Sequence, residues 1–210
     1  MLCWFKFSTL EPGSNLGATL VSQHRYPNNT GLGITIKYVS STTGYLSVNT
    51  GNGSSRTYNT YCGTTLLQAN TWYHGGFTYD NGVMKIYVNG VCEYSGNIGV
   101  QSVPADYIMA FCWSLSEASG AAVYPSYKLN GWLNDVRIYD HVLSQEDINV
   151  LAGKHTKGLQ VWLPLTHDTH NQGLYNTSIT TTSASLSNGG KVGKCYSFSG
   201  TANNVIKGYF

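Results

Sequence analysis

The sequence predicts an all-β protein, folded as an antiparallel β-sandwich with one short helix near residues 144–152. The chain has 210 residues, of which only 10% are charged, and it contains 24 glycines and 16 tyrosines. This length suits one large sandwich better than a pair of small domains. A composition poor in charge and rich in Gly and Tyr favours strands and turns over long helices.

The clearest strand lies between two hairpin turns. Asn81-Gly82 and Asn89-Gly90 bracket it, and Asn and Gly both tolerate the positive φ that tight hairpins require. Within residues 83–88, every second residue from Met84 to Val88 is apolar. That alternation places one face of the strand on a core. Together these features predict a β-meander.

The remaining elements follow from the same reasoning. Ser144 is positioned to cap a helix, Asp147 lies at the capping-box position, and Gly153 is suited to end the helix. Apolar alternation predicts further strands at residues 2–8, 20–22, 32–39, 44–48, 56–61, 66–67, 76–79, 91–94, 107–113 and 129–140.

Two motifs carry a resemblance to a known family. Residues 72–90 contain W-Y-H-G-G-F-T-Y-D and then K-I-Y-V-N-G, and residues 129–148 contain L-N-G-W-L-N-D-V-R-I-Y-D followed by a leucine-serine start of the helix. Both resemble signatures of laminin-G-like domains, which are concanavalin A-like jelly rolls. The resemblance implies a jelly-roll sandwich of the lectin kind and does not specify a ligand.

The order of the motifs departs from that family. Residues 159–165 (L-Q-V-W-L-P-L) and 193–200 (G-K-C-Y-S-F-S-G) resemble segments that normally precede the strand seen here at residues 2–8. We therefore expect residues 1–210 to form a single sandwich in which 154–210 supply the family's first strands.

Three arrangements would explain this order. The chain is a circular permutant, a strand-swapped homo-oligomer, or a piece of a tandem array that ends in half a repeat. Closure within one chain is favoured, because the first and last strands of such a sandwich are neighbours.

The acidic residues do not form a catalytic pattern. Glucanases on this scaffold use paired carboxylates on one strand, and no E-x-D-x-x-E spacing occurs. We expect no enzymatic activity, no catalytic residue and no required cofactor. Asp80 and Asn81 are secondary candidates for part of a Ca²⁺ site, since Ca²⁺ takes carboxylate and amide oxygens, although a role in the turn is the simpler interpretation.

Sugar binding requires aromatic platforms with amide or hydroxyl groups beside them. Predicted loops supply such groups, and the candidate ligand-binding residues are Tyr26, Asn28, Asn29, Trp113, Tyr124 and Tyr127. Trp72, Trp132 and Trp162 match structural positions of the family, and we expect them to serve packing.

Charge and cysteine usage restrict the partners. The net charge is +2 without a Lys/Arg cluster, which argues against nucleic acid and anionic membranes as ligands. The five cysteines form no C-x-x-C pair, and we expect free thiols buried in strands. No run is long enough for membrane insertion, and the first residues lack the features of a secretory signal.

Within the family, the sequences of these motifs are most similar to those of structural and fibre proteins of bacteriophages. This implies a product made in the bacterial cytoplasm and displayed on the virion surface, or an extracellular protein if it is not viral. The leading hypothesis is a non-catalytic adhesion module that binds cell-surface or mucosal glycan. The alternative is a structural module, a capsid decoration or a tail spacer, that binds a virion protein.

Overall fold

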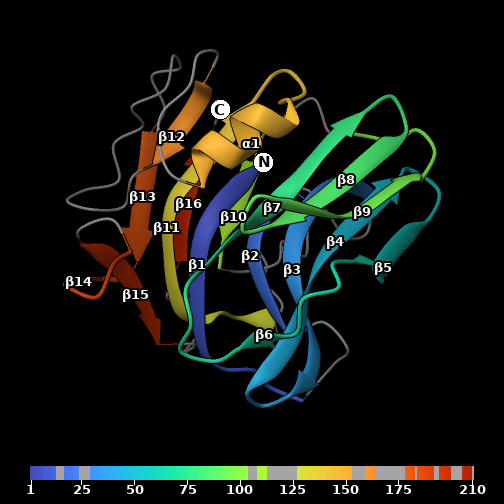
Figure 1. Ribbon diagram of the computed structural model, residues 1–210. Helices are drawn as coiled ribbons and strands as arrows, with labels where there is room; N and C mark the ends of the chain where they lie inside the picture. Colours follow the sequence, from blue (N-terminus) through green and yellow to red (C-terminus); the bar gives the residue numbers. More distant parts are fainter. Residues whose placement is uncertain are drawn as a thin grey trace.

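The computed structural model describes residues 1–12, 17–23, 29–103, 108–112, 127–152, 159–163, 178–182, 184–191, 194–199 and 205–209. Within these ranges the strands form two sheets of eight strands each, and every pairing within the sheets is antiparallel (Figure 1). The predicted antiparallel β-sandwich is confirmed. No helix in the described ranges is long and apolar enough to cross a membrane.

The front sheet carries the helix on its outer face. Its strand order is β14 (Ser185–Ser187), β15 (Cys195–Ser199), β11 (Asn130–Tyr139), β1 (Leu2–Thr9), β7 (Tyr73–Asp80), β8 (Val83–Val88) and β9 (Val91–Asn97), with β12 (Leu159–Leu163) also paired to β11.

The back sheet has the order β13 (Ser178–Thr182), β16 (Val205–Tyr209), β10 (Ile108–Phe111), β2 (Ala18–Ser22), β3 (Thr30–Ser40), β4 (Thr43–Asn52) and β5 (Arg56–Cys62), with β6 (Leu67–Gln68) paired to β4.

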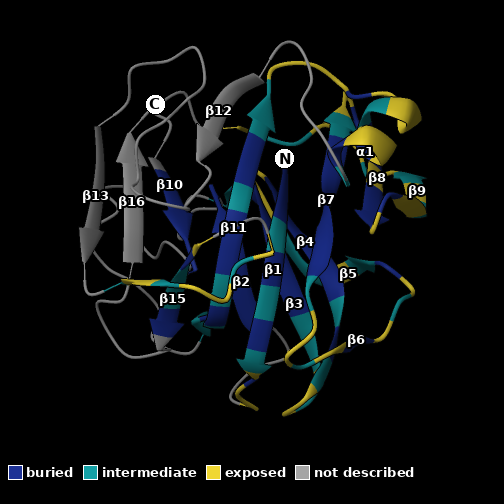
Figure 2. Ribbon diagram, turned by 60° about the vertical axis from the view of Figure 1, so that its left-hand side comes forward, coloured by how far each residue is buried: buried dark blue, intermediate teal, exposed yellow. Residues whose placement is uncertain are grey.

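The core lies between the two sheets and is formed by buried residues from both, and most of the strand residues that Figure 2 colours dark blue belong to it. In β1, the alternating residues Cys3, Phe5 and Phe7 are fully buried, whereas Trp4 and Lys6 between them are only half-buried on the outer face. This alternation is the one predicted for residues 2–8, and it follows from the two-residue period of a strand.

Helix α1 (Gln145–Leu151) begins as predicted. The Ser144 side chain accepts a hydrogen bond from the Asp147 backbone N–H, and the Asp147 carboxylate accepts one from the Ser144 backbone N–H, which completes a capping box. The helix buries Ile148 and Leu151 against Leu2 of β1 and other residues of the outer face of the front sheet.

The two hairpin turns are also confirmed. Asn81 and Gly82 have φ values of 41° and 95°, and Asn89 and Gly90 have values of 49° and 82°. These are the positive values that a tight turn between antiparallel strands requires.

The C-terminal strands cover edges of both sheets. β15 pairs with residues 130–133 of β11, and β12 pairs with residues 136–139 of the same edge. In the back sheet, β16 pairs with β10. Strands from residues 159–209 therefore extend the sheets that residues 1–152 begin (Figure 1).

The cysteines depart in part from the prediction. All five are free thiols, and Cys3, Cys112 and Cys195 are buried, but Cys62 is half-buried and Cys92 is exposed. Burial was therefore wrong for Cys92, because β9 lies at the edge of the front sheet and Cys92 faces away from the core.

Candidate functional site

The strongest candidate site is a hollow at the edge of the front sheet where β7 and β11 end. Both strands pair with β1 in antiparallel orientation. They therefore run in the same direction and end at the same edge of the sheet. Each ends in the same dipeptide, Tyr79-Asp80 in β7 and Tyr139-Asp140 at the end of β11.

We call this site the rim hollow, with a volume of about 370 Å³. That volume lies at the lower end of the range for small-molecule sites, about 300–1,000 Å³. The residues that line it are Tyr79, Asp80, Tyr139, Asp140, His141 and Val142.

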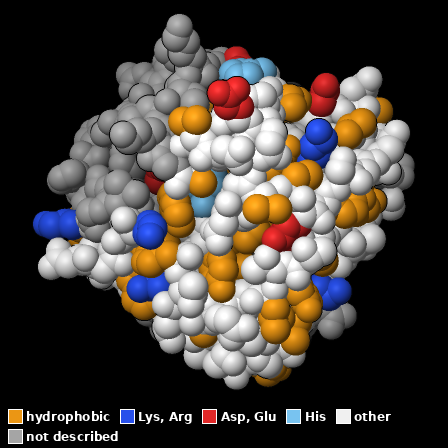
Figure 3. Space-filling model, viewed as in Figure 1, with side chains coloured by type: hydrophobic (Ala, Val, Ile, Leu, Met, Phe, Trp, Pro, Cys, Tyr) orange, Lys and Arg blue, Asp and Glu red, His pale blue; other side chains and the backbone are white. Residues whose placement is uncertain are grey.

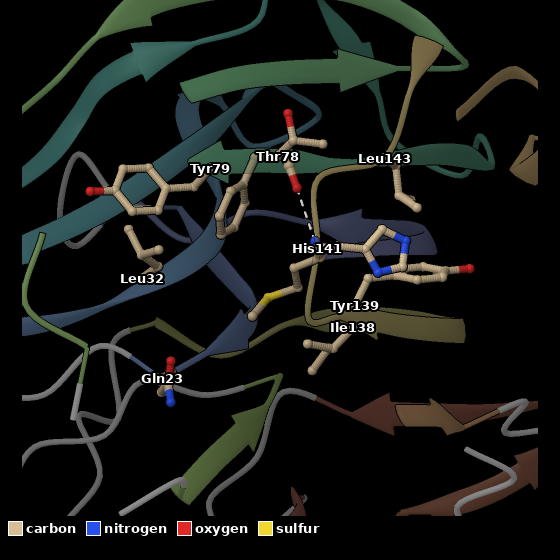
Figure 4. A pocket seen from close by; sticks show the side chains of 10 residues that line it. Gln23, Leu32, Thr78, Tyr79, Ile138, Tyr139, His141 and Leu143 are labelled. Atoms are coloured by element: carbon tan, nitrogen blue, oxygen red, sulfur yellow. Dashed lines mark hydrogen bonds between the residues drawn. The ribbon is translucent and has the colours of Figure 1, made fainter. Parts of the chain in front are cut away.

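A deeper slot of about 170 Å³ adjoins the rim hollow and shares Tyr79, Tyr139 and His141 with it. Figure 4 shows Tyr79 on one side of the slot, with Tyr139 and His141 on the other. Leu32 and Gln23 of the back-sheet side also line the slot.

Neighbouring groups hold the aromatic rings in place. The Tyr79 hydroxyl accepts a hydrogen bond from the Gln101 backbone N–H at 2.8 Å and donates one to the Gly99 carbonyl at 3.2 Å. Tyr139 packs beside the apolar residues under α1. The ring of His141 meets that of Tyr139 edge-on, with 5.7 Å between ring centres.

Polar groups lie on the solvent side of the rings. Asp80 and Asp140 are exposed, and the His141 Nδ1 lies within hydrogen-bond distance, 2.9 Å, of an Asp140 carboxylate oxygen. Two carboxylates and one imidazole therefore offer acceptors and a donor beside two aromatic rings, a combination that can hold a sugar by its C–H face and its hydroxyls.

Met1 also lines the slot. Its α-amino group donates a hydrogen bond to the Phe77 carbonyl at 2.9 Å (dashed in Figure 4), and its own carbonyl accepts one from the Phe77 N–H. Burial lowers the pKa of this amino group to about 5, so that it is uncharged at neutral pH.

The residues at the rim do not form a metal centre. Among the described parts of the chain, no three His, Cys, Asp or Glu side chains gather closely enough to hold a metal ion. Asp80 and Asn81 lie at the β7–β8 hairpin turn, where Asn81 adopts the positive φ of that turn.

The predicted ligand-binding residues are placed only in part. Tyr26, Asn28, Trp113 and Tyr124 lie outside the described residues. Asn29 stands just before β3, where its amide donates to the Ser54 carbonyl at 3.2 Å, and half-buried Tyr127 stands before β11. These sugar contacts stay a prediction.

Sequence reasoning missed the rim hollow. Tyr79 and Tyr139 belong to the family motifs, and none of Tyr79, Tyr139, Asp140 and His141 was predicted to bind a ligand. The repeated Tyr-Asp at the ends of both motif strands was the available signal. It becomes informative only when β7 and β11 are known to flank β1 and to run parallel to each other.

Asp135 of β11 holds the side chain of Arg137 in place. It adopts a φ of 50° at a bulge in β11, and its carboxylate accepts hydrogen bonds of 2.8 and 2.7 Å from Arg137. Arg137 is buried and Asp135 is half-buried, and neither residue lines the rim hollow.

Comparisons with known proteins agree with this architecture. A heptameric SAP-like pentraxin from Limulus polyphemus superposes with a TM-score of 0.53 at 16% identity, over 72% of this chain and 68% of the pentraxin. A candidate carbohydrate-binding protein from Bacteroides ovatus superposes with a TM-score of 0.57 at 18% identity, over 99% of this chain and 50% of the other.

At such identities the likeness establishes the fold alone, and the chain spans half the length of the Bacteroides protein. No curated protein matches the sequence. A model of laminin-G-like domains, described as the concanavalin A-like lectin/glucanases superfamily, matches residues 1–149. The chain therefore belongs to the laminin-G-like family of concanavalin A-like domains.

Proposed function

We propose that this protein is a non-catalytic carbohydrate-binding module whose ligand sits in the rim hollow. The observation that carries the proposal is the meeting of two Tyr-Asp pairs, Tyr79-Asp80 and Tyr139-Asp140, in one solvent-open hollow of a lectin-type sandwich.

The charge of the hollow indicates a neutral glycan. Asp80 and Asp140 accept hydrogen bonds from sugar hydroxyls but repel an acidic sugar. The tyrosine rings offer apolar surface for the C–H face of a pyranose. His141, bonded to Asp140 at 2.9 Å, fixes the orientation of that carboxylate.

The same carboxylates favour binding over hydrolysis. A glycosidase keeps one carboxylic acid protonated by placing it in an apolar environment. Asp80 and Asp140 are both exposed to solvent, and neither has the buried setting that a general acid requires.

The test is a glycan array probed with the full chain, first with calcium and then with a chelator. Reproducible binding of neutral glycans supports the proposal. Sensitivity to the chelator would show that a metal ion takes part. Release of reducing sugar from a bound glycan would contradict the non-catalytic assignment.

Variants then locate the site. Asp140→Asn and Tyr139→Ala should each weaken binding of an array hit about tenfold, the loss expected for one strong contact. Glu146→Gln removes an exposed carboxylate that does not line the hollow, and it should bind as the parent does. Asn29→Ala and Tyr127→Ala test the predicted loops, and loss of binding only in these two would overturn the assignment to the rim hollow.

We also propose display on a phage virion, on the strength of the sequence resemblance to phage structural and fibre proteins. Antibodies against the chain should then label intact particles. A blank array from folded protein, together with labelled particles, would favour the alternative of a structural module that binds a virion protein.

A further inference from the structure

A second surface, on the outer face of the front sheet, combines indole rings with lysines. Lys6 of β1 lies directly opposite Trp132 of β11. On its other side is β7, where Phe5 pairs with Tyr73 and Trp72 comes immediately before that residue. A row of Trp132, Lys6 and Trp72 therefore runs from β11 across β1 to the residue that precedes β7.

The distances show that Lys6 is held between the two rings. Its ammonium lies 4.0 Å from the centre of the Trp132 ring and 5.3 Å from that of Trp72. Both contacts are within the range of cation–π attraction. All three side chains are half-buried, so that the row is neither part of the core nor fully exposed.

The connection between β14 and β15 brings a second lysine to this surface. The Gly189 carbonyl accepts a hydrogen bond of 3.2 Å from the Trp72 indole, and the ammonium of exposed Lys191 lies 5.5 Å from the ring of Trp4. Trp4 stands two residues before Lys6 on the same face of β1. We call Trp4, Lys6, Trp72, Trp132 and Lys191 the tryptophan–lysine face.

The positive charge of this face is not balanced within the described part of the chain. Neither Lys6 nor Lys191 forms an ion pair there. The nearest carboxylate along β11, Asp135, is bound through both oxygens by Arg137. Hydrophobic and Lys/Arg side chains adjoin one another over β1, β11 and β15 (Figure 3).

We infer that the tryptophan–lysine face binds an anionic polysaccharide. The carboxylates or sulfate esters of such a chain would pair with Lys6 and Lys191, and its pyranose rings would contact the exposed parts of the indoles. The inference rests on the proposed function for the class of ligand. It differs in charge, since the rim hollow is acidic and this face is basic.

The test is affinity electrophoresis of the full chain in gels that contain one polymer each. Polygalacturonate presents carboxylates, chondroitin sulfate presents carboxylates and sulfate esters, and dextran sulfate presents sulfate esters alone, with dextran as the neutral comparison. We expect retardation by at least one anionic polymer, none by dextran, and loss of retardation as salt rises to 0.5 M, about five times the 0.1 M at which the Debye length is about 10 Å.

Charge variants locate the face. Lys6→Gln and Lys191→Gln should each weaken binding about tenfold, the loss of one hydrogen bond to a charged group. Lys37→Gln removes the same charge from β3 in the back sheet and should bind as the parent does. Circular dichroism and the melting temperature show whether each variant is folded. Trp72→Ala removes the aromatic ring, and Trp72→Phe, which keeps one, is its matched control.

Three results would overturn the inference: no retardation by any anionic polymer, equal losses in Lys6→Gln and Lys37→Gln, or equal affinity for a single-stranded oligonucleotide. Asp140→Asn separates the two sites, because it should weaken neutral glycan binding about tenfold, the loss of one strong contact, and leave anionic retardation unchanged. A blank neutral array together with Lys6-dependent retardation would reject the rim hollow and keep this face.

Discussion

The imidazole of His74 packs against the indole of Trp4, with 5.3 Å between ring centres and a tilt of 54°. His74 is 1% exposed, and its Nδ1 has no hydrogen-bond partner among the described residues. Burial lowers the pKa of His74 to about 4, although the nearby Asp135 carboxylate acts in the opposite direction. The ring is therefore neutral in the folded protein at neutral pH.

This burial predicts loss of stability in mild acid. The unfolded chain takes up a proton at His74 below pH 6.5, and the folded chain does so only near pH 4. The free energy of unfolding should therefore fall between these values, by about 3 kcal/mol from this group. Met1 acts in the same direction at higher pH, because its folded pKa of about 5 lies below its ordinary value of 8.0.

Urea unfolding at pH 7 and pH 4 measures the effect. In His74→Phe, the free energy of unfolding should fall by less between pH 7 and pH 4 than it does in the parent. His141→Gln, which changes an exposed ring, should show the same fall as the parent. If His74→Phe loses as much free energy of unfolding between pH 7 and pH 4 as the parent does, other groups cause the acid sensitivity.

The capping box predicts a second, smaller effect. Ser144→Ala removes the side chain that accepts from the Asp147 N–H, and it should cost about 1 kcal/mol, or about 2–4 °C in melting temperature. Hydrogen bonds from Ser144 also lower the pKa of Asp147. The contribution of these hydrogen bonds to stability is present above pH 3.8 and is lost as the pH falls. The melting temperature of Ser144→Ala should therefore fall less between pH 7 and pH 3 than that of the parent.

Thermal melts at pH 7 and pH 3 are sufficient for this comparison. Ser41→Ala is the control, because Ser41 lies in an exposed turn between β3 and β4 and its backbone carbonyl, not its side chain, accepts from Leu10. A fall in melting temperature for Ser41→Ala as large as that for Ser144→Ala would contradict the capping explanation.

Close packing of β1 against β11 predicts a much larger effect at Gly131. A Cβ there would stand 2.1 Å from the Lys6 carbonyl oxygen and 2.7 Å from the Phe7 Cα, both backbone atoms. Gly131→Ala should destabilise the fold by about 3 kcal/mol or abolish folding. Gly189→Ala is the control, because its Cβ would meet nothing nearer than the Ser187 hydroxyl at 3.7 Å. It should melt within a few degrees of the parent. Equal melting temperatures for the two variants would contradict this packing.

The strands of residues 159–209 predict whether the sandwich is completed within one chain. We propose that β12, β15 and β16 pair within their own chain, as a circular permutant requires. Light scattering should then give the mass of one chain, near 22.9 kDa. Rings or filaments would indicate strand swapping. Removal of residues 153–210 should cause aggregation, because β11 and β10 would become open edges.

Most elements of the fold could be predicted because their causes are local. Asn-Gly pairs adopt positive φ wherever the flanking strands allow it, and Ser144 with Asp147 caps a helix within one turn. Alternation placed Met84, Ile86 and Val88 on the core side, where all three are buried. It could not predict that Tyr87 is 2% exposed on the opposite face, because α1 covers it.

The candidate surfaces depend on contacts between distant segments. Tyr79-Asp80 and Tyr139-Asp140 meet only because β1 lies between β7 and β11 and sets them parallel. Trp132 and Trp72 flank Lys6 through strand register, which a one-residue shift would reverse.

The sequence by itself determined the sandwich, its hairpins, its capped helix and its family, because short-range periodicity and turn chemistry specify them. Only the tertiary structure decided which side chains share a surface. Cross-strand pairing joins residues that are far apart in the chain, and no local pattern records that pairing.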